Sequence, residues 1–248
     1  MSLRVTDGIR HLAENGLNLW AVFACSSLPP TIAEPMRDAG IAVGDYSRLV
    51  VVGHGGRGMW EALGRFGFRT DDPVDFFSTH LVQQMIGDYL DDARSQIIYP
   101  GRGPGVPLIR LGEAAGWSRP SPIGPGIHPE YGLWFAYRVA FLTDAPLLET
   151  EKLSPLRPCD TCEGRPCLGG CPAGAVRWPV DFQLQPCLGY RLAHESPCAD
   201  RCLARLACPV APQHRYSDEQ IGYHYRHSLP SLRRYWMSTG NLGNPQSG

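Results

Sequence analysis

The chain has 248 residues, of which 43% are hydrophobic, and its formal net charge is −1. This length suits one large domain, or a medium domain with a small one attached, and the composition excludes wholesale disorder. The near-zero charge gives no electrostatic attraction to nucleic acid or to an anionic membrane.

The first elements of the chain alternate between helix and strand signals. Residues 2–15 predict an amphipathic helix that stops at Gly16, and they lack the apolar block and cleavage site of a signal peptide. Buried strands are expected at residues 17–24 and 48–52, with a short helix between them at 31–39. No apolar run reaches the roughly 18 residues that would span a bilayer. We therefore expect a cytoplasmic protein that does not enter membranes.

The clearest periodicity lies in residues 73–93, where two adjacent lines of apolar side chains predict a long helix. Pro73 suits the first position of that helix, because its missing N–H would have no partner there. A short strand at 96–99, a short helix at 108–115 and a buried strand at 133–142 are expected to follow.

This alternation indicates a layered α/β or α+β domain. We place a first domain at residues 1–150 and a second domain at 151–236, with a disordered tail at 237–248. The Pro- and Gly-rich segment 118–129 predicts an ordered loop. A helix is expected at 217–236, whose basic and aromatic side chains either pack onto the second domain or stack on RNA.

Cysteine is concentrated in one segment. Eight of the nine cysteines lie between Cys159 and Cys208, and the residues before them contain just Cys25, which we expect to be a buried apolar residue. In a reducing cytoplasm such clustering indicates metal ligation more than disulfides. No paired carboxylates or Ser/His/Asp spacing stand out, so no catalytic residue is assigned.

The cysteine spacing is typical of an iron–sulfur protein. The first run holds Cys159, Cys162, Cys167 and Cys171, and the remaining positions are Cys187, Cys198, Cys202 and Cys208. Cys171 and Cys208 each precede a proline, and in two-cluster ferredoxins the Cys of a Cys-Pro pair ligates the other cluster. Eight thiolates satisfy two [4Fe–4S] clusters. A pair of structural zinc sites is the alternative, because four-cysteine sites with CxxC spacing also bind zinc, and disulfides are a further one.

Three segments together resemble the epoxyqueuosine reductase family. They are residues 128–147 (HPEYGLWFAYRVAFLTDAPL), the eight cysteines, and residues 208–219 (CPVAPQHRYSDE). Residues 107–117 (PLIRLGEAAGW) are also similar to the family's helix before its cofactor loop. The resemblance implies an α+β fold: a layered nitroreductase-like domain, as in cobalamin-processing chaperones, that binds a corrinoid, followed by a small ferredoxin-like Cys-rich domain with two [4Fe–4S] clusters.

The resemblance also implies which residues hold each group. One cluster would be held by Cys159, Cys162, Cys167 and Cys208, and the other by Cys171, Cys187, Cys198 and Cys202. The loop 122–132 would line the corrinoid site with His128, Tyr131 and Gly132. His128 would ligate cobalt or donate a hydrogen bond to the cofactor, although a histidine before proline more often satisfies backbone groups. His54, in the Gly-rich run 53–58, is expected in a plain strand-to-helix turn, with a phosphate-cradling turn as the alternative.

Two departures separate the chain from the family. The family's proton-donating aspartate has no counterpart in residues 101–106 (GRGPGV), and we expect none of the helical repeats that contribute to RNA binding in many members. We expect an oxidoreductase that takes electrons from a ferredoxin- or flavodoxin-type donor and passes them to a corrinoid or a small-molecule substrate. One alternative is a tRNA-modifying enzyme, which these departures disfavour. The other is an electron carrier or zinc-stabilised binding module without enzymatic activity.

Overall fold

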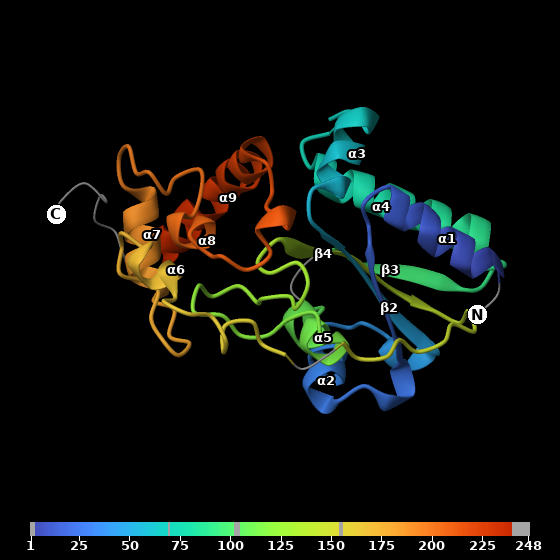
Figure 1. Cartoon of the computed structure of the whole chain (residues 1–248). Coiled ribbons are helices and arrows are strands. Elements are labelled where there is room, and N and C mark those ends of the chain that lie inside the picture. Colours follow the sequence, from blue (N-terminus) through green and yellow to red (C-terminus); the bar gives the residue numbers. More distant parts are fainter. Residues whose placement is uncertain (1–2, 69, 102–104, 154–155, 240–248) are drawn as a thin grey trace. The chain divides into compact units, whose positions relative to one another are not determined.

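The computed structural model describes residues 3–68, 70–101, 105–153 and 156–239 (Figure 1). The chain divides into two compact units. The first unit comprises Met1–Ser118 and Trp134–Pro155, and the second comprises Arg119–Leu133 and Leu156–Gly248. The loop Arg119–Leu133 thus belongs to the same unit as the eight clustered cysteines. Among the described residues, no helix has both the length and the hydropathy needed to cross a membrane.

A four-stranded antiparallel sheet forms the centre of the first unit. Its strands are β1 (Leu19–Ala24), β2 (Arg48–Gly55), β3 (Ser95–Tyr99) and β4 (Phe135–Thr143), in the order β1-β2-β4-β3. The two central strands are rich in Val, Leu and Phe, which favour a pleated, buried surface. Leu49, Val50 and Phe141 have no exposed surface at all. The fold class is therefore mixed α+β, and the alternation of elements does not produce a parallel sheet.

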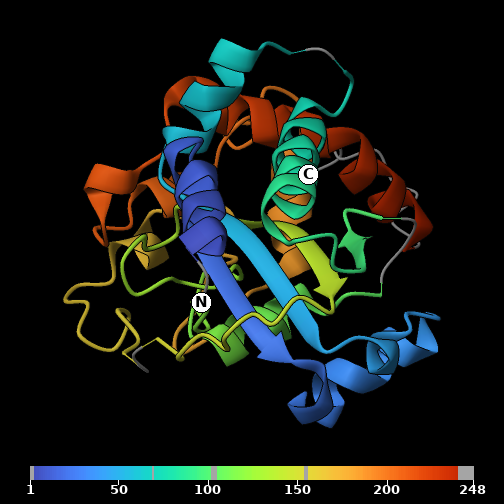
Figure 2. The same ribbon diagram turned by 90° about the vertical axis from the view of Figure 1, so that its right-hand side faces the viewer.

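Among the residues that the structure describes, five α-helices belong to the first unit with this sheet. They are α1 (Leu3–Glu14), α2 (Pro30–Asp38), α3 (Gly58–Phe66), α4 (Pro73–Tyr89) and α5 (Leu108–Ala115). Figure 1 shows α1 and α4 on one side of the sheet and α2 and α5 on the other, and Figure 2 shows α1 and α4 side by side. The close approach of α1 to α4 depends on Gly8, where an added Cβ would come within 2.8 Å of the Tyr89 ring.

A helix follows the Gly-rich run 53–58, as the expected strand-to-helix turn implies, and its bounds, which the sequence did not predict, are those of α3. Arg57 at the N-cap of α3 makes no side-chain cap hydrogen bond. In the amphipathic helix α1, Val5, Gly8 and Leu12 are buried, whereas Leu3 is 85% exposed. The other helices and strands lie where the sequence places them, within a few residues.

The second unit contains four helices among its described residues. They are α6 (Pro166–Gly169), α7 (Leu184–Leu192), α8 (Leu203–Leu206) and α9 (Asp218–Ser238). The start of α9 is fixed by Ser217, whose hydroxyl accepts a hydrogen bond from the Gln220 N–H, as a serine N-cap does. Met237 belongs to α9, and the disorder expected further along concerns residues 240–248, outside the described residues.

Candidate metal centres

The eight clustered cysteines separate into two groups of four, and each group lines its own cavity in the second unit. The first group lines a cavity of about 20 Å³ and consists of Cys159, Cys162, Cys167 and Cys208. The second group lines a cavity of about 410 Å³ and consists of Cys171, Cys187, Cys198 and Cys202. These are the two sets that the family resemblance implies. The structure brings each set together, and ligation itself stays a prediction.

Two short helices hold the groups in place. The helices α6 and α8 pack against each other. Cys167 lies in α6 and Cys171 directly beyond it, while Cys202 is the N-cap of α8 and Cys208 follows that helix. Each helix therefore has one cysteine of each group within it or close to one of its ends. Cys171 and Cys208, the two cysteines that precede a proline, therefore line a different cavity from the cysteine just before them in the sequence.

Apolar side chains cover the first group. Cys167 and Cys208 are buried in a small core. The other buried members of that core are Ile123, Ile127, Leu133, Val176 and Ala204. The loop 119–133 thus supplies three of the residues that keep water from these sulfurs, and burial of this kind is one of the properties that set a cluster's potential.

Backbone amides point at several of the sulfurs. The N–H of Arg205 donates to Sγ of Cys202 at 3.4 Å. The N–H of Leu203 donates likewise to Cys198, and the N–H of Val210 to Cys208. Hydrogen bonds to the charged form favour it, so these amides stabilise thiolates. Such hydrogen bonds are common at cluster sulfurs and contribute to their potentials.

Electrostatic coupling between the thiols follows the same division. Burial raises the pKa of Cys159 to about 11, with further increases from the other three cysteines of the first group. Burial also raises the pKa of Cys187 to about 11, again with increases from the other three cysteines of its own group. Four thiolates gathered in one cavity thus repel one another, and a bound cation reverses this effect.

The sulfurs of each group line one cavity but are not bonded to one another. All nine cysteines of the chain are free thiols, so the structure pairs none of them as disulfides. Among the described residues, no three His, Cys, Asp or Glu side chains are close enough to share one metal ion. A zinc ion would draw four sulfurs to about 2.3 Å from a common centre. A cubane cluster spreads the four thiolates over its four irons and accepts a wider arrangement.

His128 is completely buried in the loop of the second unit. Its Nδ1 accepts hydrogen bonds from the N–H groups of Glu130 and Tyr131, at 3.0 and 3.2 Å. These bonds place the proton of the neutral ring on Nε2. Burial, aided by His214, lowers the pKa of His128 to about 4. The ring therefore orders the turn as a neutral acceptor, and its ligation of cobalt stays a prediction.

Gly132 closes the same turn. It exchanges two backbone hydrogen bonds with His128 and has φ +58°, a left-handed conformation that glycine adopts without penalty. A Cβ at this position would meet the Val210 carbonyl oxygen at 2.7 Å. Tyr131 stands edge-on to His214, with ring centroids 4.7 Å apart. The three residues assigned to a corrinoid thus lie together, in the unit that holds the cysteines.

His54 is not in a turn, because β2 continues to Gly55. The His54 side chain is completely buried in the first unit, and its Nδ1 accepts a hydrogen bond from Nε of Arg138 at 2.9 Å. The chain turns at Gly56 and Arg57 instead, directly before α3. The expectation that His54 lies in the turn, with either of its roles there, is therefore wrong.

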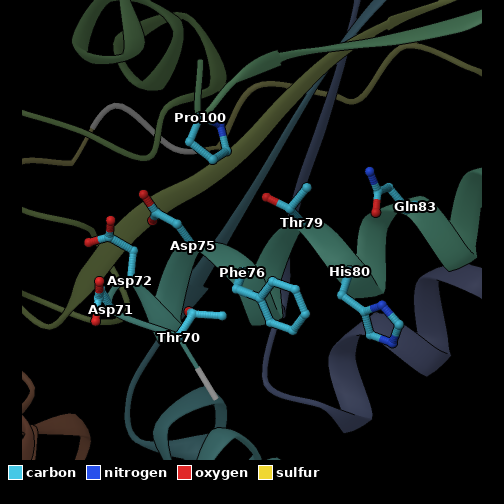
Figure 3. Close-up of a pocket in the computed structure, with 9 residues that line it drawn as sticks. All are labelled: Thr70, Asp71, Asp72, Asp75, Phe76, Thr79, His80, Gln83 and Pro100. Carbon is cyan, nitrogen blue, oxygen red and sulfur yellow. The ribbon is translucent and has the colours of Figure 1, made fainter. Parts of the chain in front are cut away.

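Sequence reasoning also missed a groove on the first unit, shown in Figure 3. Its volume is about 620 Å³. Its lining residues are Thr70, Asp71, Asp72, Asp75, Phe76, Thr79, His80, Gln83 and Pro100. Most of them come from one side of α4, where Phe76 and His80 stack at 5° to each other. In the sequence, polar residues at this helical spacing indicate an exposed helix face, and nothing in the pattern predicts a groove.

The sequence matches no protein-family model and no curated protein. Solved structures do share its fold. The epoxyqueuosine reductase from Streptococcus thermophilus matches with a TM-score of 0.53 and 10% identity over 85% of this chain. The epoxyqueuosine reductase from Bacillus subtilis matches with a TM-score of 0.53 and 12% identity over 86% of this chain. The chain spans 66% of the length of each of these proteins, somewhat less than two thirds.

A catabolic reductive dehalogenase, NpRdhA, solved with 3-bromo-4-hydroxybenzoic acid, matches with a TM-score of 0.50 and 13% identity. The match covers 91% of this chain and 34% of the dehalogenase. At these identities the likeness shows a shared fold. All three of these structural relatives are reductases, and the similarity of the chain to them is distant.

Proposed function

We propose that this chain is an iron–sulfur oxidoreductase that holds two [4Fe–4S] clusters in its second unit and passes electrons to a corrinoid or another small acceptor. The observation that carries the proposal is the division of eight cysteines into two groups of four, each around its own cavity. The residues fit such clusters in number, since each cubane takes four thiolates. They also fit in chemistry, since backbone amides donate to the sulfurs.

The acceptor is the less defined part of the proposal. A corrinoid is implied by the family resemblance, and the shared fold with reductases is consistent with an electron acceptor in the chain. A bound corrinoid would supply a cobalt centre that takes up electrons. This chain's residues would bury the clusters, orient the cofactor and exclude water. The electron donor, of ferredoxin or flavodoxin type, belongs to the same proposal.

Metal analysis tests the clusters. We expect about eight irons and as many sulfides per chain after anaerobic reconstitution, which is the content of two cubanes. The variants Cys167→Ser and Cys187→Ser should each lose the signal of one cluster in electron paramagnetic resonance, and the two lost signals should differ. Cys25→Ser, which changes a thiol in the first unit, serves as the matched control and should keep both. Zinc in place of iron would contradict the proposal.

A separate titration tests the acceptor. The reduced holoprotein is mixed anaerobically with cob(II)alamin, and absorption is followed. Binding should change the corrinoid bands, and electron transfer should reduce its cobalt. No spectral change, with both clusters present, would remove the corrinoid and leave the iron–sulfur part intact. Retention of tRNA at low salt, where phosphate contacts are strongest, would instead favour the tRNA-modifying alternative.

A further inference from the structure

Arg191 brings a positive charge to the second group of cysteines. It lies on α7 four residues after Cys187, so both side chains lie on the same face of that helix. Arg191 lines the same cavity as the four cysteines of the second group. Its side chain is half-buried, and burial lowers its pKa, although a guanidinium keeps its proton in proteins. A fixed cation therefore stands at this cavity.

Three contacts with α9 hold the Arg191 side chain. One terminal nitrogen donates to the Tyr225 carbonyl oxygen at 2.7 Å and to the Ser228 hydroxyl at 2.9 Å. The guanidinium carbon also lies 4.5 Å from the centre of the Tyr225 ring, a cation–π arrangement. None of these neutral partners cancels the charge. These contacts hold the guanidinium in one position, so its positive charge acts on the cavity from a fixed place.

The ionisable groups that act on Arg191 are the phenol of Tyr225 and the thiols of Cys187, Cys202 and Cys198, which carry no negative charge while they are protonated. In the part of the chain that the structure describes, no carboxylate forms an ion pair with it. A partly buried guanidinium without a counter-ion is costly. Neutral thiols do not offset that cost, whereas a ligated cluster does. Its four thiolates outweigh the positive charge of the oxidised iron–sulfide core, and reduction adds one more negative charge.

We propose that Arg191 is a positioning residue that raises the reduction potential of the cluster held by the second group. The inference rests on the proposed function and goes beyond it, because it assigns a residue that selectively tunes one of two clusters. A fixed positive charge stabilises the reduced cluster, which is the more negative form, more than the oxidised one. The second cluster thereby accepts an electron more readily than its ligands alone would allow.

Arg201 provides a matched control within the same cavity. It also lines the cavity of the second group, but its Nε lies 2.8 Å from a carboxylate oxygen of Asp200. Its charge is therefore largely cancelled before it reaches the sulfurs. The double replacement Asp200→Asn/Arg201→Gln removes both charges of this pair and leaves the formal charge of the protein unchanged, so it reports any effect of substitution at the cavity that is not due to the unpaired charge of Arg191.

The test is an anaerobic redox titration of the full reconstituted chain, followed by electron paramagnetic resonance. In Arg191→Gln we expect one of the two midpoint potentials to become more negative, with a tenfold loss in the equilibrium constant for reduction, about 59 mV for one electron. The shifted signal should be the one that Cys187→Ser abolishes. Arg191→Lys, which keeps the charge, should lie near the wild type, and Asp200→Asn/Arg201→Gln, which removes a neutral pair, should leave both potentials unchanged.

The inference fails if Arg191→Gln keeps both clusters and both potentials, or if Asp200→Asn/Arg201→Gln shifts the same potential equally. If Arg191→Gln loses the second cluster, the Arg191→Lys variant is the deciding test. A potential of its second cluster equal to that of the wild type supports the inference, and a more negative potential overturns it. Loss of the cluster from both variants also overturns it, since Arg191 would then serve assembly rather than potential. A wild-type chain without iron would instead overturn the proposed function itself.

Discussion

In the first unit, β2 and β4 bury their apolar side chains beneath helices of up to 17 residues. In the second unit, α6 and α8 have four residues each, and the cysteines Cys167 and Cys208 belong to the core themselves. Helices this short are not stable on their own. Burial of apolar surface accounts for the order of the first unit, and in the second unit we expect the proposed clusters to supply part of the stability that such short helices lack.

Removal of iron should have the largest effect of the changes considered, and it should destabilise the second unit but not the first. Structural metal sites contribute on the order of 10 kcal/mol to folding, because the site does not exist in the unfolded chain. After anaerobic treatment with a chelator, amides of α7 and α8 should lose their protection against hydrogen exchange. Amides of β2 and β4 should keep theirs. Equal protection of α7 with and without iron would contradict the comparison.

Truncation of a core side chain in the first unit should destabilise that unit and leave the second unit unaffected. Phe141 is completely buried in β4 and lies 5.9 Å from the Trp20 ring. Phe141→Ala should lower the free energy of unfolding of the first unit by about 3–5 kcal/mol, since it leaves a cavity. The iron content should not change. Leu3→Ala, at a side chain that is 85% exposed, is the matched control and should have little effect on thermal or urea unfolding.

His128 makes the second unit sensitive to acid. Its pKa is lowered from 6.5 to about 4, so the fold favours the neutral ring. This contribution, about 3 kcal/mol, is complete above pH 6.5 and is lost as the pH falls toward 4. His128→Asn keeps an acceptor for the turn but does not titrate. Urea unfolding of both proteins at pH 7 and pH 4.5 should show a larger loss in the wild type. Parallel losses would refute this role.

The turn at Gly132 should give the smallest effect. Gly132→Ala forces a side chain into a left-handed conformation and toward the Val210 carbonyl oxygen. The cost should be roughly 1–2 kcal/mol, the penalty of that conformation. Gly169→Ala, at a position where an added Cβ meets nothing within 4 Å, is the control. Similar unfolding midpoints for the two variants would show that the turn does not need its glycine.

Most helices and strands of the first unit could be predicted from the sequence, because their apolar side chains recur at regular spacing. The helix α5 matches its expected bounds of 108–115, and α4 begins at Pro73 as the apolar spacing required. The strand-to-helix turn expected at 53–58 implied a helix, but the bounds of α3 were not predicted, because no side chain caps its start. Its position depends on burial of Met59 and Leu63, a tertiary effect that local propensity does not contain.

The site was predicted in part. Cysteine spacing indicated metal ligation, but the assignment of each thiol to a group came from the family resemblance, since spacing does not say which distant cysteines meet. Arg191 carried no signal beyond its position four residues after Cys187. His54 was misplaced because Gly53 and Gly55 are typical of a turn, whereas both pair with β4 in the sheet.

The order of the cysteines along the chain nests one group inside the other. The 40 residues between Cys167 and Cys208 contain every member of the second group. A nascent chain would therefore complete its inner ligand set at Cys202, while the outer set still lacks its last thiolate. Closing the inner set first shortens the loop that the outer set must close, which lowers the entropy lost in that step. If the proposed clusters form, we therefore expect the second cluster to assemble before the first.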